Sequence, residues 1–123
     1  MARVSSYKDL LVWQKGMNLV ESTYRARGIL PTYEQWGLTS QMRRAAVSVP
    51  SNIAEGYGRQ ATGEYRHHLS IGRGSLLELE THVLLCERLR YLKPDEVKPP
   101  HACCRLWRVK CPELSRFQRE SVT

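Results

Sequence analysis

The feature that most constrains the fold is a run of apolar residues spaced three or four positions apart, which places them on one face of an α-helix. In residues 62–92 this spacing persists over about three heptads. It recurs in residues 6–27 and 38–58, whereas the alternation typical of β-strands is absent. We therefore predict an all-α fold. The predicted inner faces of its three helices carry Leu10, Trp13, Met17, Val20 and Tyr24, then Leu38, Met42, Ala45, Ala46, Val49, Ile53 and Tyr57, and then Tyr65, Leu69, Gly72, Leu76, Leu79, Val83 and Cys86.

Capping residues predict where these helices begin and end. Ser6 followed by Asp9 is typical of a helix N-cap with an acid in the first turn, and Gly28 is a typical helix end. We expect Thr39 to cap the second helix. Thr62 opens the third helix, which we expect to run to about residue 92.

One proline and four glycines fall within or beside the helical pattern. Pro50 removes a backbone hydrogen bond and clashes with the preceding turn, so we expect a kink or a break there. Gly56 and Gly58 are expected to end the second helix. Gly72 and Gly74 lower helix propensity by roughly 1 kcal/mol each, and close approach of another helix would compensate for this cost.

A turn at Pro50 would give a different structure. With Pro50 in the turn and Ser51 capping a recognition helix, residues 46–57 would form a helix-turn-helix that reads a DNA sequence. However, the apolar stripe continues from Leu38 to Tyr57 in one register, which a sharp turn would break. The pattern therefore favours a single helix over sequence-specific DNA binding.

The length of 123 residues suits a single domain that spans residues 1–123. No apolar run approaches the ~18 residues of a membrane span, and the first residues lack the apolar stretch of a signal peptide. We therefore expect a cytoplasmic protein without a membrane partner. The formal net charge of +7 favours contact with nucleic acid or another polyanion.

Arginines on the second and third helices are the strongest candidates for ligand contacts. Guanidinium groups match the geometry of phosphate oxygens. The alternative is a solvated face with local ion pairs, since Glu55 lies four residues before Arg59. We predict nucleic-acid contacts at Arg44, Arg59, Arg66 and Arg73.

Further apolar residues point away from the predicted inner faces of the same two helices. A monomer with so small a core would expose them, and apolar strips on adjacent helices indicate an interface. We predict a homo-oligomer interface formed by Val47, Pro50 and Ala54 of the second helix and by Ile71, Leu85 and Leu89 of the third.

The sequence contains two incomplete sets of metal ligands. Glu64 and His67 have the Glu-x-x-His spacing of half a di-iron site, but a second such pair is absent. The other set lacks the paired Cys-x-x-Cys spacing of a zinc site; it comprises His101, Cys103, Cys104 and Cys111. No spacing indicates a nucleophile with its base. We predict no metal, cofactor, catalytic residue or small-molecule substrate, and we expect that the protein is not an enzyme.

Three segments resemble one protein family. GLTSQMRRAAVSVPSNIAEGYGR, residues 37–59, resembles the signature of the 23S rRNA intervening-sequence proteins. YKDLLVWQKGMNLVESTY, residues 7–24, resembles that family's first helix, and residues 64–92 resemble its third. The resemblance implies an up-down-up-down four-helix bundle, a ring-forming homo-oligomer with a pentamer favoured, and a Pro50 that is tolerated within a long helix. The family is also similar to the accessory variability protein of diversity-generating retroelements, a basic ring that works with nucleic acid.

Residues 98–123 depart from this family pattern. The family's fourth helix is amphipathic and acid-rich, whereas this segment is rich in Pro, Cys, Arg and Trp. It resembles a GC-rich gene read out of frame, and a divergent tail is the alternative. We therefore expect a poorly ordered segment and leave the fourth helix in doubt.

Two hypotheses for function follow. The first is a non-catalytic homo-oligomer that binds RNA or DNA through phosphates, without strong sequence preference. The second is a structural or adaptor protein that binds another protein and has no role with nucleic acid.

Overall fold

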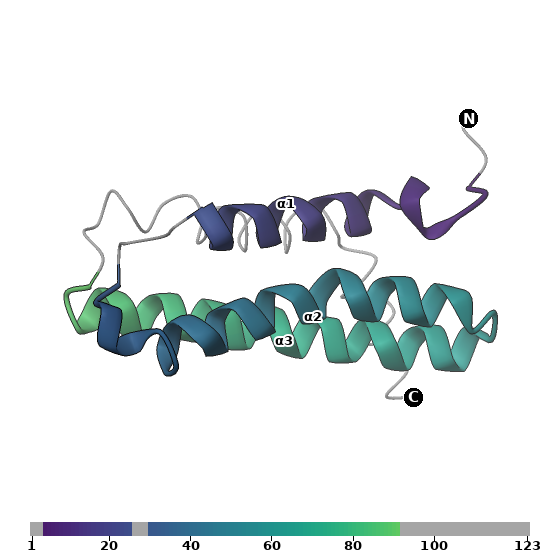
Figure 1. Cartoon of the computed structure of the whole chain (residues 1–123). Coiled ribbons are helices and arrows are strands. Elements are labelled where there is room, and N and C mark those ends of the chain that lie inside the picture. The colour runs from purple at the N-terminus through teal and green to yellow at the C-terminus, as the bar shows by residue number, and fades with distance from the viewer. Residues whose placement is uncertain (1–3, 26–29, 92–123) are drawn as a thin grey trace.

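A computed structural model describes residues 4–25 and 30–91, and these residues form helices without any strand. The long helices are α1 (Leu11–Arg25), α2 (Leu38–Gly58) and α3 (Thr62–Arg88). Successive helices run in opposite directions: α2 and α3 lie side by side along their length, and α1 packs against α2 (Figure 1). The all-α prediction is confirmed over these residues. The predicted fourth helix and the tail at 98–123 fall outside them.

The first predicted helix is divided into two pieces. Ser6 caps a single 3-10 turn, η1 (Tyr7–Asp9), with the reciprocal hydrogen bonds of a capping box, so its capping role is confirmed. Leu10 is extended, and α1 begins at the next residue. The Gln14 side chain joins the two pieces, because its Nε2 donates to the Lys8 carbonyl at 2.9 Å.

The start of α2 differs from the prediction. Thr39 lies inside the helix, so its assignment as the cap is wrong. Glu34, in the short 3-10 helix η2 (Thr32–Glu34), takes that role because its Oε2 accepts a 2.9 Å hydrogen bond from the Leu38 N–H. A carboxylate at this position also interacts favourably with the helix dipole.

Pro50 is accommodated inside α2, which continues without a break from Leu38 to Gly58. The helix-turn-helix alternative is therefore wrong. Pro50 is also buried, which overturns the prediction that it points outward into an oligomer interface. The physical reason is α1: a Cβ built on Gly16 would lie 3.3 Å from the Pro50 Cβ, so the glycine allows α1 to pack directly on the proline ring.

The glycines of α2 and α3 have different roles. Gly58 ends α2 as predicted, and the chain reverses through Gln60, whose φ is +60°. Gly56 instead allows close packing, since a Cβ there would lie 2.6 Å from the Cβ of His68 on α3. A Cβ on Gly72 would lie 3.5 Å from a carbonyl oxygen of α2, which confirms the predicted close approach, whereas Gly74 faces open space.

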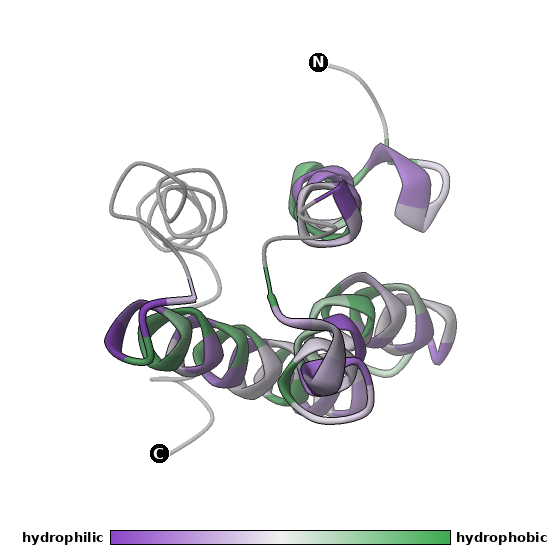
Figure 2. Ribbon diagram, turned by 60° about the vertical axis from the view of Figure 1, so that its left-hand side comes forward, coloured by the Kyte–Doolittle hydropathy of each residue, from purple (hydrophilic) through white to green (hydrophobic). Residues whose placement is uncertain are grey.

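The core lies mainly between α2 and α3. Hydrophobic residues, green in Figure 2, recur along both helices between hydrophilic ones. The buried apolar side chains are Leu19, Met42, Ala45, Ala46, Val49, Ile53, Leu69, Leu76, Leu79, Val83 and Cys86.

The inner face of α1 is rotated from its predicted position. Met17 and Tyr24 are 40% and 39% exposed, so their assignment to the core is wrong. The buried residues of α1 are instead Gly16, Leu19 and Thr23. Trp13 and Val20 pack against the edge of the core.

A membrane-spanning helix would need a longer uninterrupted apolar stretch than any helix in the described residues has.

Candidate functional site

The four predicted arginines lie on or beside the α2–α3 hairpin but are not equally available. Arg44 is exposed and Arg73 is half-buried, and neither forms a hydrogen bond or ion pair with another described residue. Arg59 is paired with Glu55 at 3.1 Å, four residues earlier on α2. A phosphate at Arg59 would have to compete with this carboxylate. Arg66 is half-buried near the start of α3.

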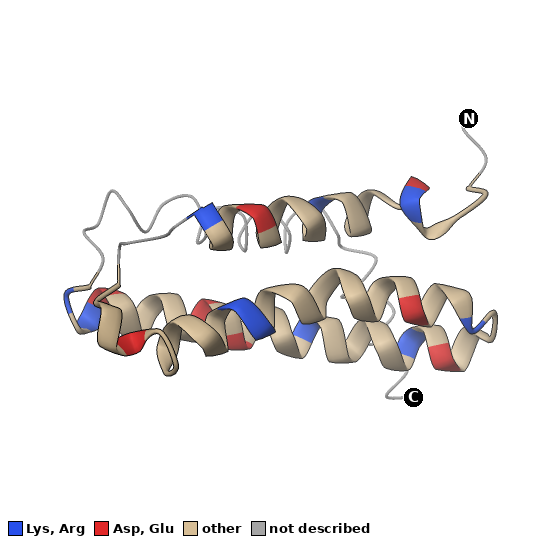
Figure 3. Cartoon of the chain, in the orientation of Figure 1, with Lys and Arg blue, Asp and Glu red and all other residues tan. Residues whose placement is uncertain are grey.

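These arginines do not gather in one patch. Arg44 and Arg59 are fifteen residues apart, which corresponds to roughly 22 Å along a helix axis. Figure 3 shows acidic residues interspersed with the basic ones along the hairpin. The described residues carry ten Lys and Arg against eight Asp and Glu, so most of the net charge of +7 lies outside them. The ability of the described residues to bind a phosphate therefore depends more on the local arrangement of individual arginines than on the total charge.

A concave groove surrounds Arg44. It has a volume of about 600 Å³ and is formed by the end of α1, the turn before α2 and the first half of α2. Among the described residues, no acidic side chain lines it, whereas two arginines do. The lining residues are Tyr24, Gln35, Trp36, Ser40, Arg43, Arg44, Val47 and Ser48.

Arg43 and Trp36 are the groove residues that the sequence reasoning missed. Arg43 stacks on the Tyr24 ring, with its guanidinium carbon 4.9 Å from the ring centroid, and its buried Nε has no hydrogen-bond partner among the described residues. Trp36 is 86% exposed. An aromatic residue in a connector shortly before an Arg-Arg pair was the available signal, but only the fold brings Tyr24 to the same place.

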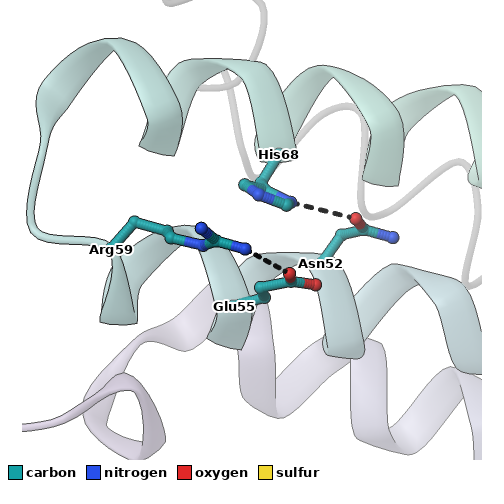
Figure 4. Close-up of polar contacts among 4 residues, drawn as sticks. All are labelled: Asn52, Glu55, Arg59 and His68. Atoms are coloured by element: carbon teal, nitrogen blue, oxygen red, sulfur yellow. Dashed lines mark hydrogen bonds and ion pairs between the residues drawn. The ribbon is translucent and has the colours of Figure 1, made fainter.

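Polar contacts between α2 and α3 fix the wall of the groove. Ser75 Oγ donates to Ser48 Oγ at 2.8 Å, and Asn52 Nδ2 donates to the same hydroxyl at 2.9 Å. The Asn52 Oδ1 lies 3.2 Å from His68 Nδ1 and can only accept, so this hydrogen bond requires the Nδ1–H form of the imidazole (Figure 4). Asn52 therefore joins the helices and is engaged before any ligand arrives.

The remaining predicted interface residues have mixed exposure. Val47 is exposed but lies in the groove, and Ala54 is half-buried. Ile71 and Leu85 on α3 and Leu89 directly after its end are all exposed. The strip on α3 is interrupted, because Glu78 lies seven residues from both Ile71 and Leu85 and so occupies the same side of the helix.

Two of the candidate metal residues, Glu64 and His67, lie in the part of the chain that the structure describes. Glu64 and His67 are both on the exposed surface of α3. No group of three or more His, Cys, Asp or Glu within residues 4–25 and 30–91 has the geometry to hold a metal ion. His101 and the three C-terminal cysteines lie outside the described residues.

Comparison with known families matches residues 8–106 to the model described as 23S rRNA-intervening sequence protein. The chain belongs to this family. The matched region includes all three helices and the groove, and it continues past residue 98, where we predicted the departure from the family pattern to begin. No curated protein matches the chain. The description of the intervening-sequence family names no catalytic activity.

Proposed function

We propose that this protein is a non-catalytic homo-oligomer that binds RNA or other nucleic acid through phosphate contacts. The observation that carries the proposal is the groove, where two guanidinium groups line a concave surface to which the described residues contribute no acidic side chain. Arginine forks bind phosphate oxygens through charge-assisted hydrogen bonds.

Of the four predicted arginines, the two without a partner among the described residues are the leading phosphate contacts. Arg44 lies in the groove, and Arg73 lies on the neighbouring helix without a described carboxylate beside it. Arg59 is a weaker contact, because its pairing with Glu55 must be lost or shared. Arg66 is the fourth proposed contact, near the start of α3.

Oligomerisation supports this function by multiplying weak contacts. Several copies of a low-affinity phosphate site bind one long nucleic acid with high avidity when the geometry allows simultaneous contact. Exposed Ile71, Leu85 and Leu89 supply apolar surface for such an assembly, which we propose to be the ring, with a pentamer favoured, that the family resemblance implies. Glu78, whose Oε1 lies 3.8 Å from His82 Nε2 on the same helix, would then lie at or inside the subunit contact.

Filter binding of structured RNA at about 50 and 200 mM salt tests the phosphate contacts. Each phosphate contact gives a log K versus log salt slope of about −0.7 for single strands and −0.9 for duplexes. Replacing both Arg44 and Arg73 by Ala should weaken binding to all sequences and reduce the slope by about two contacts. The matched control replaces Lys8 and Arg88, two exposed basic residues that do not line the groove, and removes the same charge. No binding at about 50 mM salt would refute the proposal and favour an adaptor protein.

Light scattering tests the assembly. Leu85→Glu adds a charge to the exposed strip without touching the groove, and it should cost several kcal/mol of association if the residue becomes buried between subunits. Val47 is less suitable, because a charge there would alter the groove as well. A wild-type protein that elutes as a monomer at micromolar concentration would contradict the oligomer.

A further inference from the structure

The groove holds an aromatic ring that neither the core nor the phosphate contacts explain. Trp36 is the most exposed large hydrophobic residue that the structure describes. It lies on a turn fixed at both ends: the Gln35 N–H donates to the Thr32 carbonyl at 3.1 Å, and the Gly37 N–H donates to the Glu34 carbonyl at 3.0 Å. The indole is therefore presented from a firmly hydrogen-bonded position.

The side chains that α2 contributes to the groove are also held in place before a ligand binds. Arg43 is held against the Tyr24 ring, and its Nε is buried without a partner among the described residues. Arg44 is exposed beside it, and Ser48 is anchored to α3 through Ser75. An indole, two guanidinium groups and neutral hydrogen-bonding groups thus surround one concave volume of about 600 Å³, which falls in the ordinary range for small-ligand sites.

This combination fits one nucleotide unit. An indole face binds a base by stacking, and a guanidinium group binds the adjoining phosphate. Gln35 and Ser40 line the same groove and can form hydrogen bonds with the edge of the base. Bases in a duplex are stacked on one another and are not available to an indole at the protein surface, so the unit must come from a single strand or loop. Glu34 occupies the N-terminus of α2, which leaves the arginines as the phosphate contacts.

We propose that the groove is a stacking subsite for one unpaired base of a single-stranded nucleic acid, with Trp36 against the base and Arg44 on its phosphate. This inference rests on the proposed nucleic-acid function and makes it more specific, because it assigns a preference for unpaired bases. Stacking on an aromatic residue discriminates little among the four bases, which agrees with binding that lacks sequence preference.

Fluorescence anisotropy at about 50 mM salt tests the subsite with two labelled probes of equal length and charge. One is a short oligoadenylate, and the other is the same ribose-phosphate chain without bases. The wild-type protein should bind the oligoadenylate more tightly by about 5-fold to 150-fold, the range that one stacked base supplies. Trp36→Ala should reduce this ratio to within about 2-fold and leave the affinity for the abasic chain unchanged. Trp36→Phe, which keeps an aromatic face, should retain most of the ratio.

The outcomes separate the subsite from the general function. If the wild-type protein binds both probes equally and with a salt dependence, the subsite is refuted while the phosphate-binding function stands. If it binds neither probe nor structured RNA, both proposals fail. If Trp36→Ala changes the oligomeric state measured by light scattering, the groove is a contact between subunits and the subsite is again refuted. Because Trp36 is almost fully exposed, its replacement should leave thermal unfolding unchanged, and this is measured on the same samples.

Discussion

The α2–α3 hairpin and α1 are packed into one core by different means. Between α2 and α3, fully buried side chains such as Val49 and Leu79 are reinforced by hydrogen bonds that join the two helices. α1 adds a single large buried side chain, Leu19, and approaches α2 where Gly16 meets Pro50. The hairpin is therefore the structural base of the described fold, and α1 is a more weakly held layer. This difference matters for function, because the groove is built where the end of α1 meets α2.

The largest expected effect comes from breaking the hairpin core. Leu79 is completely buried, so Leu79→Ala should cost about 2–5 kcal/mol in the free energy of unfolding through lost burial and a new cavity. Leu84, on the same helix but 41% exposed, is the matched control, and its replacement by Ala should cost less than about 1 kcal/mol. Urea denaturation measures both. Equal losses would mean that α3 is covered on the Leu84 side by another part of the protein or by a second copy.

A methyl group at the tightest crossing of the hairpin should have the next largest effect. Gly56→Ala would place a Cβ 2.6 Å from the His68 Cβ and force α2 and α3 apart, at a cost of about 1–3 kcal/mol. Gly58→Ala, two residues later and with open space around its Cβ, should not destabilise the protein. Thermal unfolding of the two variants gives the comparison. A stable Gly56→Ala protein would show that the helices are not in close contact at this point.

A smaller effect is expected where α1 meets α2. Gly16→Ala brings a Cβ to 3.3 Å from Pro50, but the gain in helix propensity of about 1 kcal/mol offsets much of the crowding. The net loss should stay under about 1 kcal/mol, and hydrogen exchange should show lower protection in α1 with α2 and α3 unchanged. Gly74→Ala, in open space on α3, serves as the control and should be neutral or stabilising. Equal loss of protection in all three helices would show that α1 and the hairpin open as one unit.

The smallest effect concerns a single thiol in the hairpin core. Burial, with a minor contribution from the nearby Glu34 charge, raises the pKa of Cys86 from 9.0 to about 11. The native protein should therefore resist alkylation at Cys86 near pH 8, while urea should expose the same thiol to it. Because the pKa of this thiol is higher in the folded state than in the unfolded state, its contribution to the free energy of unfolding is fully present below pH 9. That contribution is lost as the pH rises toward 11, where the buried thiol ionises. Peptide mapping by mass spectrometry follows the alkylation, and a Cys86 modified in the native protein as fast as in urea would refute its burial.

Sequence patterns predicted the helices better than their ends and faces. The apolar spacing identified all three helices, and the unbroken register from Leu38 to Tyr57 correctly favoured one helix through Pro50. The first boundary was misplaced because Leu10 is extended, and the α2 cap was misassigned because Glu34 reaches it from a neighbouring turn. Both errors arise from local hydrogen bonds that apolar spacing does not encode.

For the candidate site, the sequence indicated which residue types could bind phosphate but not which of them are available. Arg44 and Arg73 lack described partners, whereas Arg59 is paired with Glu55, an alternative that the four-residue spacing had raised. The groove itself was not predicted. Its lining comes from α1, the turn after η2 and the first half of α2, and adjacency among separate segments is not visible in a periodic pattern.

The sequence by itself determined that the described chain is helical, because a spacing of three to four residues buries apolar side chains only on a helix. It also indicated the close approach of another helix at Gly72, whereas the tighter contact at Gly56 emerged only from the packing of α2 on α3. Only the tertiary structure decided the rotation of α1: contact between Gly16 and Pro50 turns Leu19 inward and leaves Met17 and Tyr24 at the surface. That rotation sets Tyr24 beneath Arg43, and so the groove exists because of how the helices pack rather than because of any one segment.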